Sequence, residues 1–255
     1  MTTALITGAS TGIGAAFARR LAEDGLDLVL VARSADKLEL LASEVRASTG
    51  VSVTVLPKDL GARDAPAELA AECERLGLDV DFLLNNAGFG THGLVADADP
   101  AHLADEVRLN CATLTELTAR FLPAMTARGR GTIVNVASNA AFQPLPQMAV
   151  YGATKAFVLS FTEALWHEAK GTGVRVLALC PGPTDTPFFE IAGEDFAGAN
   201  KRTTDQLIAT AKRALARNQP SVVDGLGNAA LARLGTRLLP KRLLLLAAEK
   251  VVTPR

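Results

Sequence analysis

The segment Thr7-Gly8-Ala9-Ser10-Thr11-Gly12-Ile13-Gly14 is the most informative stretch of this chain. A short apolar run at residues 4–7, typical of a strand, leads into it, and an amphipathic run at residues 13–23, typical of a helix, follows it. Glycines accept positive φ and let the backbone approach an anion, and a helix N-terminus offers free N–H groups with partial positive charge. We therefore predict that this turn binds the phosphates of a dinucleotide.

The same alternation of strand-like and helix-like runs continues along the chain. Further strand-like runs are residues 28–32, 51–56, 82–84, 132–137, 174–179 and, more weakly, 221–224. Further helix-like runs are residues 35–47, 66–76, 101–127 and 150–170. Several strand-like runs are apolar on both faces, as in a parallel sheet covered by helices on each side. With no linker, repeat or low-complexity segment, this pattern predicts an α/β fold with one doubly wound domain over residues 1–255.

Composition excludes several classes of protein. The 255 residues are 49% hydrophobic and 21% charged, which favours a globular core over disorder or coiled coil. The longest apolar run, residues 243–248, is too short to span a membrane, and residues 1–7 do not read as a signal peptide. Three scattered cysteines (Cys73, Cys111, Cys180) and three separated histidines give no disulfide framework and no metal-binding spacing. We expect a cytoplasmic protein with reduced thiols and no metal site.

Charge is distributed unevenly along the chain. Residues 201–255 hold eleven Lys/Arg against three Asp/Glu, although the net charge of the whole chain is −1. Within this region, residues 226–255 are predicted to form a basic, Leu-rich helical extension. We expect it to pack on the body or on a neighbouring subunit; contact with a membrane surface is the less favoured alternative. Nucleic-acid binding is not expected, because the chain is slightly acidic and poor in aromatic residues.

The end of the second strand-like run indicates which dinucleotide is bound. An acidic residue there would bind the adenosine ribose and repel a 2′-phosphate, whereas this chain has Ala32 followed by Arg33, with Lys37 four residues later. This favours NADP(H) over NAD(H). The alternative is that Arg33 is simply a solvated side chain at the end of a strand.

Tyr151, the only tyrosine, and Lys155 are four residues apart in a helix-like run, so they would share one helix face. A phenol titrates near pH 10, and a neighbouring ammonium would lower its pKa toward the range useful for proton transfer, although burial of the phenolate would oppose this. Ser138 ends the strand-like run thirteen residues earlier, where ligands of open α/β sheets bind. Taken alone, Ser138 would be interpreted as a cap of the next turn, and a lone Tyr-x-x-x-Lys is common.

Taken together, these residues resemble the short-chain dehydrogenase/reductase family. The motifs, within residues 2 to about 188, are Thr7-Gly8-x-x-x-Gly12-x-Gly14, Asp59-Leu60, Asn85-Asn86-Ala87-Gly88, Asn110, Ser138, Tyr151-x-x-x-Lys155 and Pro181-Gly182-x-x-x-Thr186. The resemblance implies a Rossmann-type domain with a parallel sheet of about seven strands that binds NAD(H) or NADP(H). It also implies a homodimer or homotetramer formed through the helices at residues 101–127 and 150–170.

The resemblance also implies a role for each site residue. Tyr151 would be the general acid in carbonyl reduction and the base in alcohol oxidation, and Lys155 would lower its pKa and bind the nicotinamide ribose. Ser138 would hold the substrate oxygen, and Asn110 would hold a water that links Lys155 to solvent. The predicted cofactor-binding residues are Gly8, Ser10, Thr11, Gly12, Ile13, Gly14, Arg33, Lys37, Asp59, Leu60, Asn86, Ala87, Gly88, Tyr151, Lys155, Pro181, Gly182, Thr184 and Thr186.

After Thr186 the family pattern ends, and we predict that residues 187–217 form a variable substrate lid. The lid would contribute aromatic residues to an apolar pocket, unless those residues are ordinary core. The candidate pocket residues are Phe89, Phe142, Leu145, Phe188 and Phe189. The predicted substrate is therefore an apolar ketone, aldehyde or secondary alcohol.

The sequence thus predicts an NADP(H)-dependent oxidoreductase that transfers a hydride between nicotinamide and a carbonyl/alcohol pair. Two alternatives remain at this point. One is a catalytically silent cofactor-binding regulator of the same fold, and the other is a peripheral membrane protein recruited by its basic tail.

Overall fold

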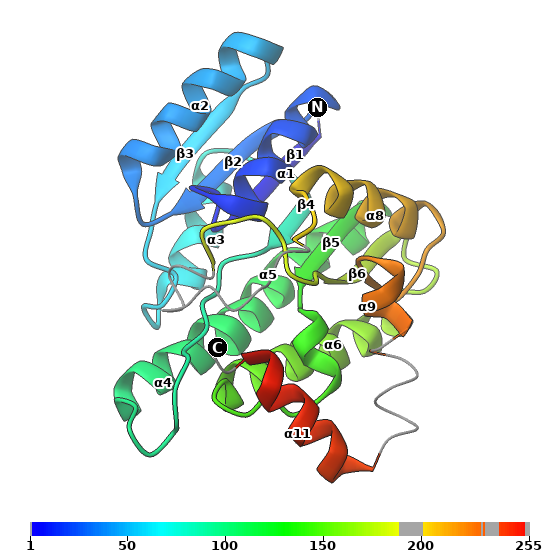
Figure 1. The fold of residues 1–255 in the computed structure, drawn as a ribbon. Coiled ribbons are helices and arrows are strands. Elements are labelled where there is room, and N and C mark those ends of the chain that lie inside the picture. Colours follow the sequence, from blue (N-terminus) through cyan, green and yellow to red (C-terminus); the bar gives the residue numbers. More distant parts are fainter. Residues whose placement is uncertain (1, 189–200, 231, 233–239, 253–255) are drawn as a thin grey trace.

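The computed structural model describes residues 2–188, 201–230, 232 and 240–252 (Figure 1). Its strands are β1 (Thr3–Thr7), β2 (Asp27–Ala32), β3 (Val53–Pro57), β4 (Val80–Asn85), β5 (Gly131–Val136), β6 (Val174–Cys180) and β7 (Ser221–Val223). They pair in parallel in the order β3-β2-β1-β4-β5-β6-β7. The predicted doubly wound Rossmann-type sheet is confirmed.

Helices cover both faces of this sheet (Figure 1). The main helices are α1 (Gly12–Glu23), α2 (Ala35–Thr49), α3 (Ala65–Arg75), α4 (Pro100–Val107), α5 (Leu114–Ala127), α6 (Ala149–Glu168) and α8 (Thr204–Ala216). One apolar cluster joins α1, α2 and α8 to the sheet, and a second joins α3, α5 and α6 to its other face. Central strands such as β1 are buried on both faces, which explains their continuous apolar sequence.

The helix expected at residues 101–127 contains an irregular segment. Between α4 and α5, η1 (Arg108–Thr113) is a π-helix. A π-turn widens the helix locally and is common at functional sites. Here it contains Asn110, whose side chain leaves the helix to bond the loop after β4.

The second half of the predicted lid is a core helix instead. Residues 204–216 form α8, which begins with a capping box made by Thr203 and Gln206. Leu207, Ile208 and Ala211 are buried against the sheet. Their spacing in the sequence is that of an amphipathic helix, and this pattern explains the difference from the predicted lid. The first half, including Phe189, lies outside the described residues except for Pro187 and Phe188.

The C-terminal extension is helical where it is described. It contains α9 (Leu226–Ala230) and α11 (Lys241–Val252), with residues 233–239 and 253–255 outside the described part. Leu244 and Ala248 of α11 are buried, whereas Leu243 and Leu246 are exposed. Within the described ranges, no helix is long and apolar enough to cross a membrane.

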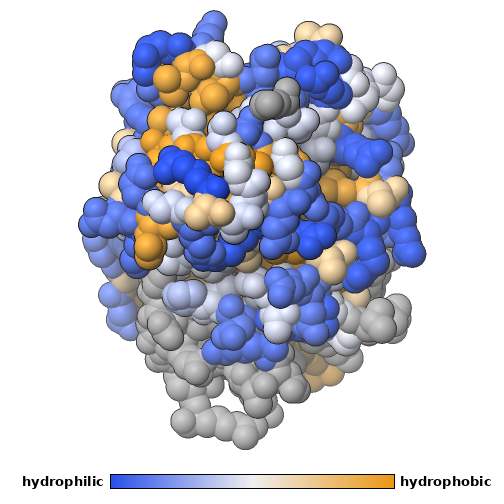
Figure 2. Space-filling view, turned by 90° about the horizontal axis from the view of Figure 1, so that it is seen from above, coloured by the Kyte–Doolittle hydropathy of each residue, from blue (hydrophilic) through white to orange (hydrophobic). Residues whose placement is uncertain are grey.

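The face seen from above in Figure 2 is largely hydrophilic, with hydrophobic atoms showing between charged side chains. Exposed ion pairs join neighbouring helices, such as Arg19–Glu44 at 2.7 Å and Lys212–Asp24 at 2.6 Å. Exposed pairs of this kind contribute little to stability, so the fold depends mainly on the two buried clusters.

Candidate active site

The site lies where the winding of the sheet reverses. β1 has β2 on one side and β4 on the other, so the loops that follow β1 and β4 diverge at their carboxyl ends. A cavity of about 910 Å³ opens there and extends from Arg33 to Phe188. Its position agrees with the general rule for ligand binding in open α/β sheets.

The glycine turn has the backbone shape expected for phosphate binding. Gly8 and Gly12 have φ values of +64° and +56°, which disfavour any residue with a side chain. A Cβ on Gly14 would lie 2.3 Å from the Gly8 carbonyl oxygen. Thus Gly14 provides close packing at the start of α1, while Gly8 and Gly12 line the cavity with the residues between and beside them.

Asn86, directly after β4, is hydrogen-bonded to this turn. Its side-chain Nδ2 donates to the carbonyl oxygens of Thr7 and Gly8, at 2.9 and 3.2 Å. The Thr7 hydroxyl in turn accepts from the backbone N–H groups of Asn86 and Ala87, at 2.9 and 3.0 Å. These bonds hold the glycine turn against the segment that follows β4.

Positive side chains surround the outer end of the cavity. Arg33 and Lys37 line it, are exposed, and make no hydrogen bond or ion pair with any described residue. Lys58 lines the same end but is paired with Glu68 at 2.7 Å. Two unpaired cations at this position suit a bound phosphate.

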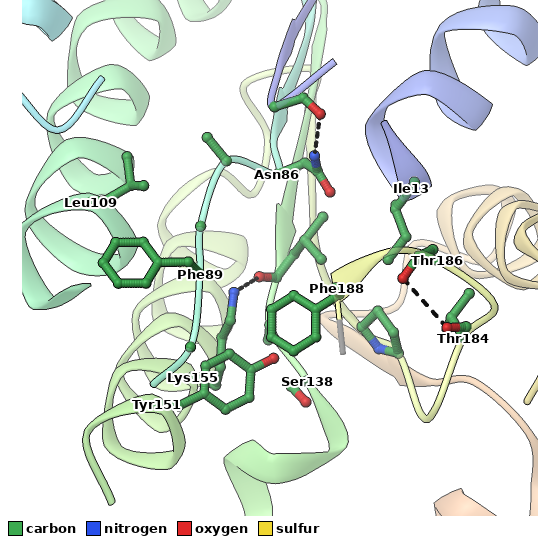
Figure 3. Close-up of a pocket in the computed structure, with 18 of the residues that line it drawn as sticks. Ile13, Asn86, Phe89, Leu109, Ser138, Tyr151, Lys155, Thr184, Thr186 and Phe188 are labelled. Carbon is green, nitrogen blue, oxygen red and sulfur yellow. Dashed lines mark hydrogen bonds between the residues drawn. The ribbon is translucent and has the colours of Figure 1, made fainter. Parts of the chain in front are cut away.

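Three polar side chains meet at the inner end of the cavity (Figure 3). Ser138 follows β5, and its hydroxyl donates to Asn139 Oδ1 at 3.3 Å. The hydroxyl is also close enough to the phenol of Tyr151, in the first turn of α6, to lower the pKa of that phenol. The same Ser138 oxygen accepts from the Ala140 N–H at 3.1 Å, so it also caps the short 3₁₀ helix η2 (Asn139–Phe142). Ser138 therefore caps this turn and also lines the cavity. Lys155 lies one turn after Tyr151, and its Nζ donates to the Val136 carbonyl at 2.8 Å.

The effect of Lys155 on Tyr151 differs from the sequence-based expectation. Burial raises the pKa of Tyr151 to about 12, against a smaller lowering by the Ser138 hydrogen bond. Burial also lowers the pKa of Lys155 to about 8. The Lys155 nitrogen lies 5.7 Å from the centre of the phenol ring and bonds a backbone carbonyl. In the protein alone, desolvation outweighs the attraction of the ammonium, and the phenol stays protonated at neutral pH.

Asn110 is buried and does not line the cavity. Its amide nitrogen donates to the Phe89 carbonyl at 2.8 Å and to the Thr154 hydroxyl at 3.1 Å, and its oxygen accepts from the Phe89 N–H at 3.1 Å. These bonds explain why an asparagine occurs inside an apolar helical run. They fix the loop after β4 to α6 beside Lys155.

A family model described as short chain dehydrogenase matches residues 2–196. The chain belongs to the short-chain dehydrogenase/reductase family. A curated relative, 17-beta-hydroxysteroid dehydrogenase type 3 of Mus musculus, is 34% identical over 189 residues, covering 72% of this chain and 60% of the relative. The chain spans about 60% of the length of the first curated relatives that it matches.

Solved structures of other family members resemble the whole fold. A short-chain dehydrogenase from Sphingobium yanoikuyae in complex with NADPH has 36% identity and a TM-score of 0.84, over 90% of both chains. The bulky-bulky ketone specific alcohol dehydrogenase from Comamonas testosteroni has 31% identity and a TM-score of 0.80, over 94% of this chain and 96% of that chain.

Apolar side chains surround the three polar groups at the inner end of the cavity. Phe89, Phe142, Leu145 and Phe188 line it, and the Phe188 ring lies 5.5 Å from that of Tyr151 (Figure 3). Leu145 is also part of a buried cluster, so pocket and core are continuous here. Phe189 lies outside the described residues.

Every predicted cofactor residue lines the cavity except Gly14, and every predicted catalytic residue except Asn110. Three contributors were missed. Lys58 follows the end of β3 and was signalled by its place beside Asp59. Asn228 of α9 lies against Gly182 and lines the cavity. Ala248 of α11 belongs to the buried cluster that includes Tyr151. No local pattern in the sequence brings these two residues near the site.

Proposed function

We propose that this chain is an NADP(H)-dependent oxidoreductase that interconverts an apolar ketone or aldehyde and its alcohol. The main support is the arrangement of the cavity lining. Ser138, Tyr151 and Lys155 lie together at one end of the cavity, and the glycine turn and Arg33 lie at the other end. A site with a proton donor at one end and a phosphate cradle at the other suits a nicotinamide dinucleotide.

The residues present fit such a cofactor. The closely packed glycine turn would hold the pyrophosphate, and Arg33 with Lys37 would hold a 2′-phosphate. The NADPH complex of the structural neighbour from Sphingobium yanoikuyae supports the same preference. When bound, the nicotinamide exchanges a hydride with the substrate carbon.

Side chains of the protein itself donate and accept the proton. Tyr151 is a neutral phenol at neutral pH, so it can donate its proton to the oxygen of a carbonyl substrate. The Ser138 hydroxyl donates a hydrogen bond to the same oxygen and stabilises the charge that develops there. Lys155, whose pKa is about 8, is mainly an ammonium at pH 7 and favours the phenolate left behind. In alcohol oxidation the same phenolate takes the proton back.

We assign the substrate to a bulky apolar class. Phe89, Phe142 and Phe188 offer aromatic surface beside Tyr151 and Ser138. The names of two relatives, a 17-beta-hydroxysteroid dehydrogenase and a bulky-bulky ketone specific alcohol dehydrogenase, support the same class. We propose that the segment from Phe188 to the start of α8 selects among such substrates.

A panel of aliphatic, aromatic and polycyclic ketones tests the activity. The purified protein is mixed with NADPH and each ketone, and loss of the reduced cofactor is followed. We expect turnover with bulky apolar ketones and little with charged ones. Binding of NADPH without turnover of any carbonyl or alcohol would contradict the proposal and would indicate a catalytically silent regulator.

We also propose that the protein assembles as a homodimer or homotetramer through α4, α5 and α6. Val107 and Phe157 are exposed on these helices, at 46% and 44%, and Phe157 stacks on Phe161. Exposed aromatic and aliphatic residues on neighbouring helices are typical of a subunit interface. Sedimentation analysis of the full chain tests this, and a monomer at micromolar concentration would contradict it.

A further inference from the structure

Glu106 of α4 is a buried acid without a partner. Its side chain is 0% exposed, and neither carboxyl oxygen makes a hydrogen bond with any described residue. Burying an ionised carboxylate without hydrogen bonds is costly, so such groups are rare.

The position of Glu106 connects the surface with the site. It lies four residues after His102 and four before Asn110, so the three side chains follow one helix face. His102 is exposed, whereas Glu106 and Asn110 are buried. Asn110 then bonds Thr154, the neighbour of Lys155.

The backbone of the loop after β4 contacts the catalytic phenol. A Cβ on Gly90 would lie 2.8 Å from Cδ2 of Tyr151, so this backbone touches the phenol ring. The next residue, Thr91, is close enough to Glu106 to lower its pKa, yet the Thr91 hydroxyl makes no hydrogen bond of good geometry either. A charge on Glu106 therefore acts on Tyr151 through protein rather than through water, where it is weakly screened.

The charged and titratable groups around Glu106 come from three elements. His102 lies on its own helix, Cys111 on η1, and Tyr151 and Lys155 on α6. Burial raises the pKa of Glu106, opposed by Thr91, His102 and Lys155. The Glu106 charge in turn raises the pKa of Tyr151, Lys155 and Cys111.

We propose that Glu106 is a positioning residue that sets the protonation of the Tyr151–Lys155 pair and biases the site toward carbonyl reduction. Its negative charge favours the neutral phenol, which gives a proton to the substrate oxygen. The same charge acts directly against the phenolate that must remove a proton from an alcohol. This proposal rests on the proposed function.

The single tyrosine allows a direct test that needs no cofactor or substrate. Glu106→Gln keeps the shape of the side chain and removes its charge. Tyrosinate formation is followed by ultraviolet difference absorbance over the pH range in which circular dichroism reports folded protein. We expect it to begin at lower pH in Glu106→Gln than in the wild type, by about half a pH unit or more. Glu116→Gln, which removes an exposed carboxylate of α5, is the matched control and should not shift it.

The pH profile of alcohol oxidation gives the second readout. Its acid limb, which reports loss of the phenolate, should move to lower pH by a similar amount in Glu106→Gln. A shift in neither measurement, or in only one of them, overturns the proposal. Absence of turnover by the wild-type protein would instead contradict the proposed function and leave the tyrosinate result standing.

Glu106→Met provides a second neutral variant of similar volume. Replacing a buried ionised group with a neutral one of the same size is usually tolerated or stabilising. Both variants should therefore fold and give the same downward shift. If neither folds, Glu106 is a structural residue and the proposal is wrong.

Discussion

Burial acts in opposite directions on the two partners of the Tyr151-x-x-x-Lys155 pair. It raises the pKa of the phenol to about 12 and lowers that of the amine to about 8. Both shifts favour the neutral form of the group that is being desolvated. The spacing of the two residues was visible in the sequence, but the cost of removing both from water was not, because it depends on segments far away in the chain.

At the adenosine end, one arginine is expected to choose the cofactor. Arg33→Ala should raise the KM for NADPH about tenfold or more and leave the KM for NADH nearly unchanged, because a charge-assisted bond to phosphate contributes about 1.5–3 kcal/mol. Steady-state kinetics with both cofactors measure this.

Arg75→Ala, which removes an exposed arginine of α3, serves as the control for Arg33→Ala. Equal losses for NADPH and NADH in the Arg33 variant would mean that Arg33 does not recognise the 2′-phosphate.

Helix α11 contributes to the site across a long separation in sequence. Ala248 is 1% exposed and packs in one cluster with Leu145, Met148 and Tyr151. The sequence indicated a basic helical extension, but amphipathic spacing alone cannot say which surface a terminal helix covers.

Filling the space at Ala248 should alter substrate choice. In Ala248→Phe, the larger side chain must displace Leu145 or Met148, which line the cavity. We expect the KM for bulky ketones to rise roughly tenfold and that for NADPH to stay constant, since overpacking costs about 1–3 kcal/mol. Kinetics with a small and a bulky ketone measure the difference.

Leu246→Phe is the control for this element, because Leu246 lies on the same helix and is 57% exposed. Identical kinetics for Ala248→Phe and Leu246→Phe would show that α11 does not shape the pocket.

Across the whole molecule, the fold was more predictable than the site. The parallel sheet follows from strand-like runs that are apolar on both faces and from the glycine turn at Gly8. Most residues that line the cavity could also be named, because they lie at strand ends or in short motifs. Asn228, Ala248 and the unpartnered acid Glu106 could not, since their roles arise from contacts between distant segments.

The buried pair also makes global stability depend on pH. The pKa of Lys155 is about 8 in the folded protein, below its ordinary value of 10.5. Between these two pH values the folded state binds fewer protons than the unfolded state, so the free energy of unfolding should rise with pH. The raised pKa of Tyr151 has the opposite effect: it lowers the free energy of unfolding as the pH rises above the ordinary tyrosine pKa of 10.0.

Comparison with Lys155→Met isolates the first effect. Between the folded pKa of about 8 and pH 10, the unfolding free energy of the wild type relative to this variant should increase with pH. The slope should not exceed about 1.4 kcal/mol per pH unit. Urea unfolding at a series of pH values measures it, and parallel curves for the two proteins would argue against a buried, destabilised ammonium.

The account depends most on the phenol of Tyr151 as the proton donor. The decisive measurement is turnover of a reactive ketone by Tyr151→Phe. NADPH binding by the same variant is measured in parallel through cofactor fluorescence. We expect binding to be retained and turnover to fall by about 10²-fold to 10⁴-fold, because only the acidic hydroxyl is lost. Wild-type turnover in this variant would contradict the account.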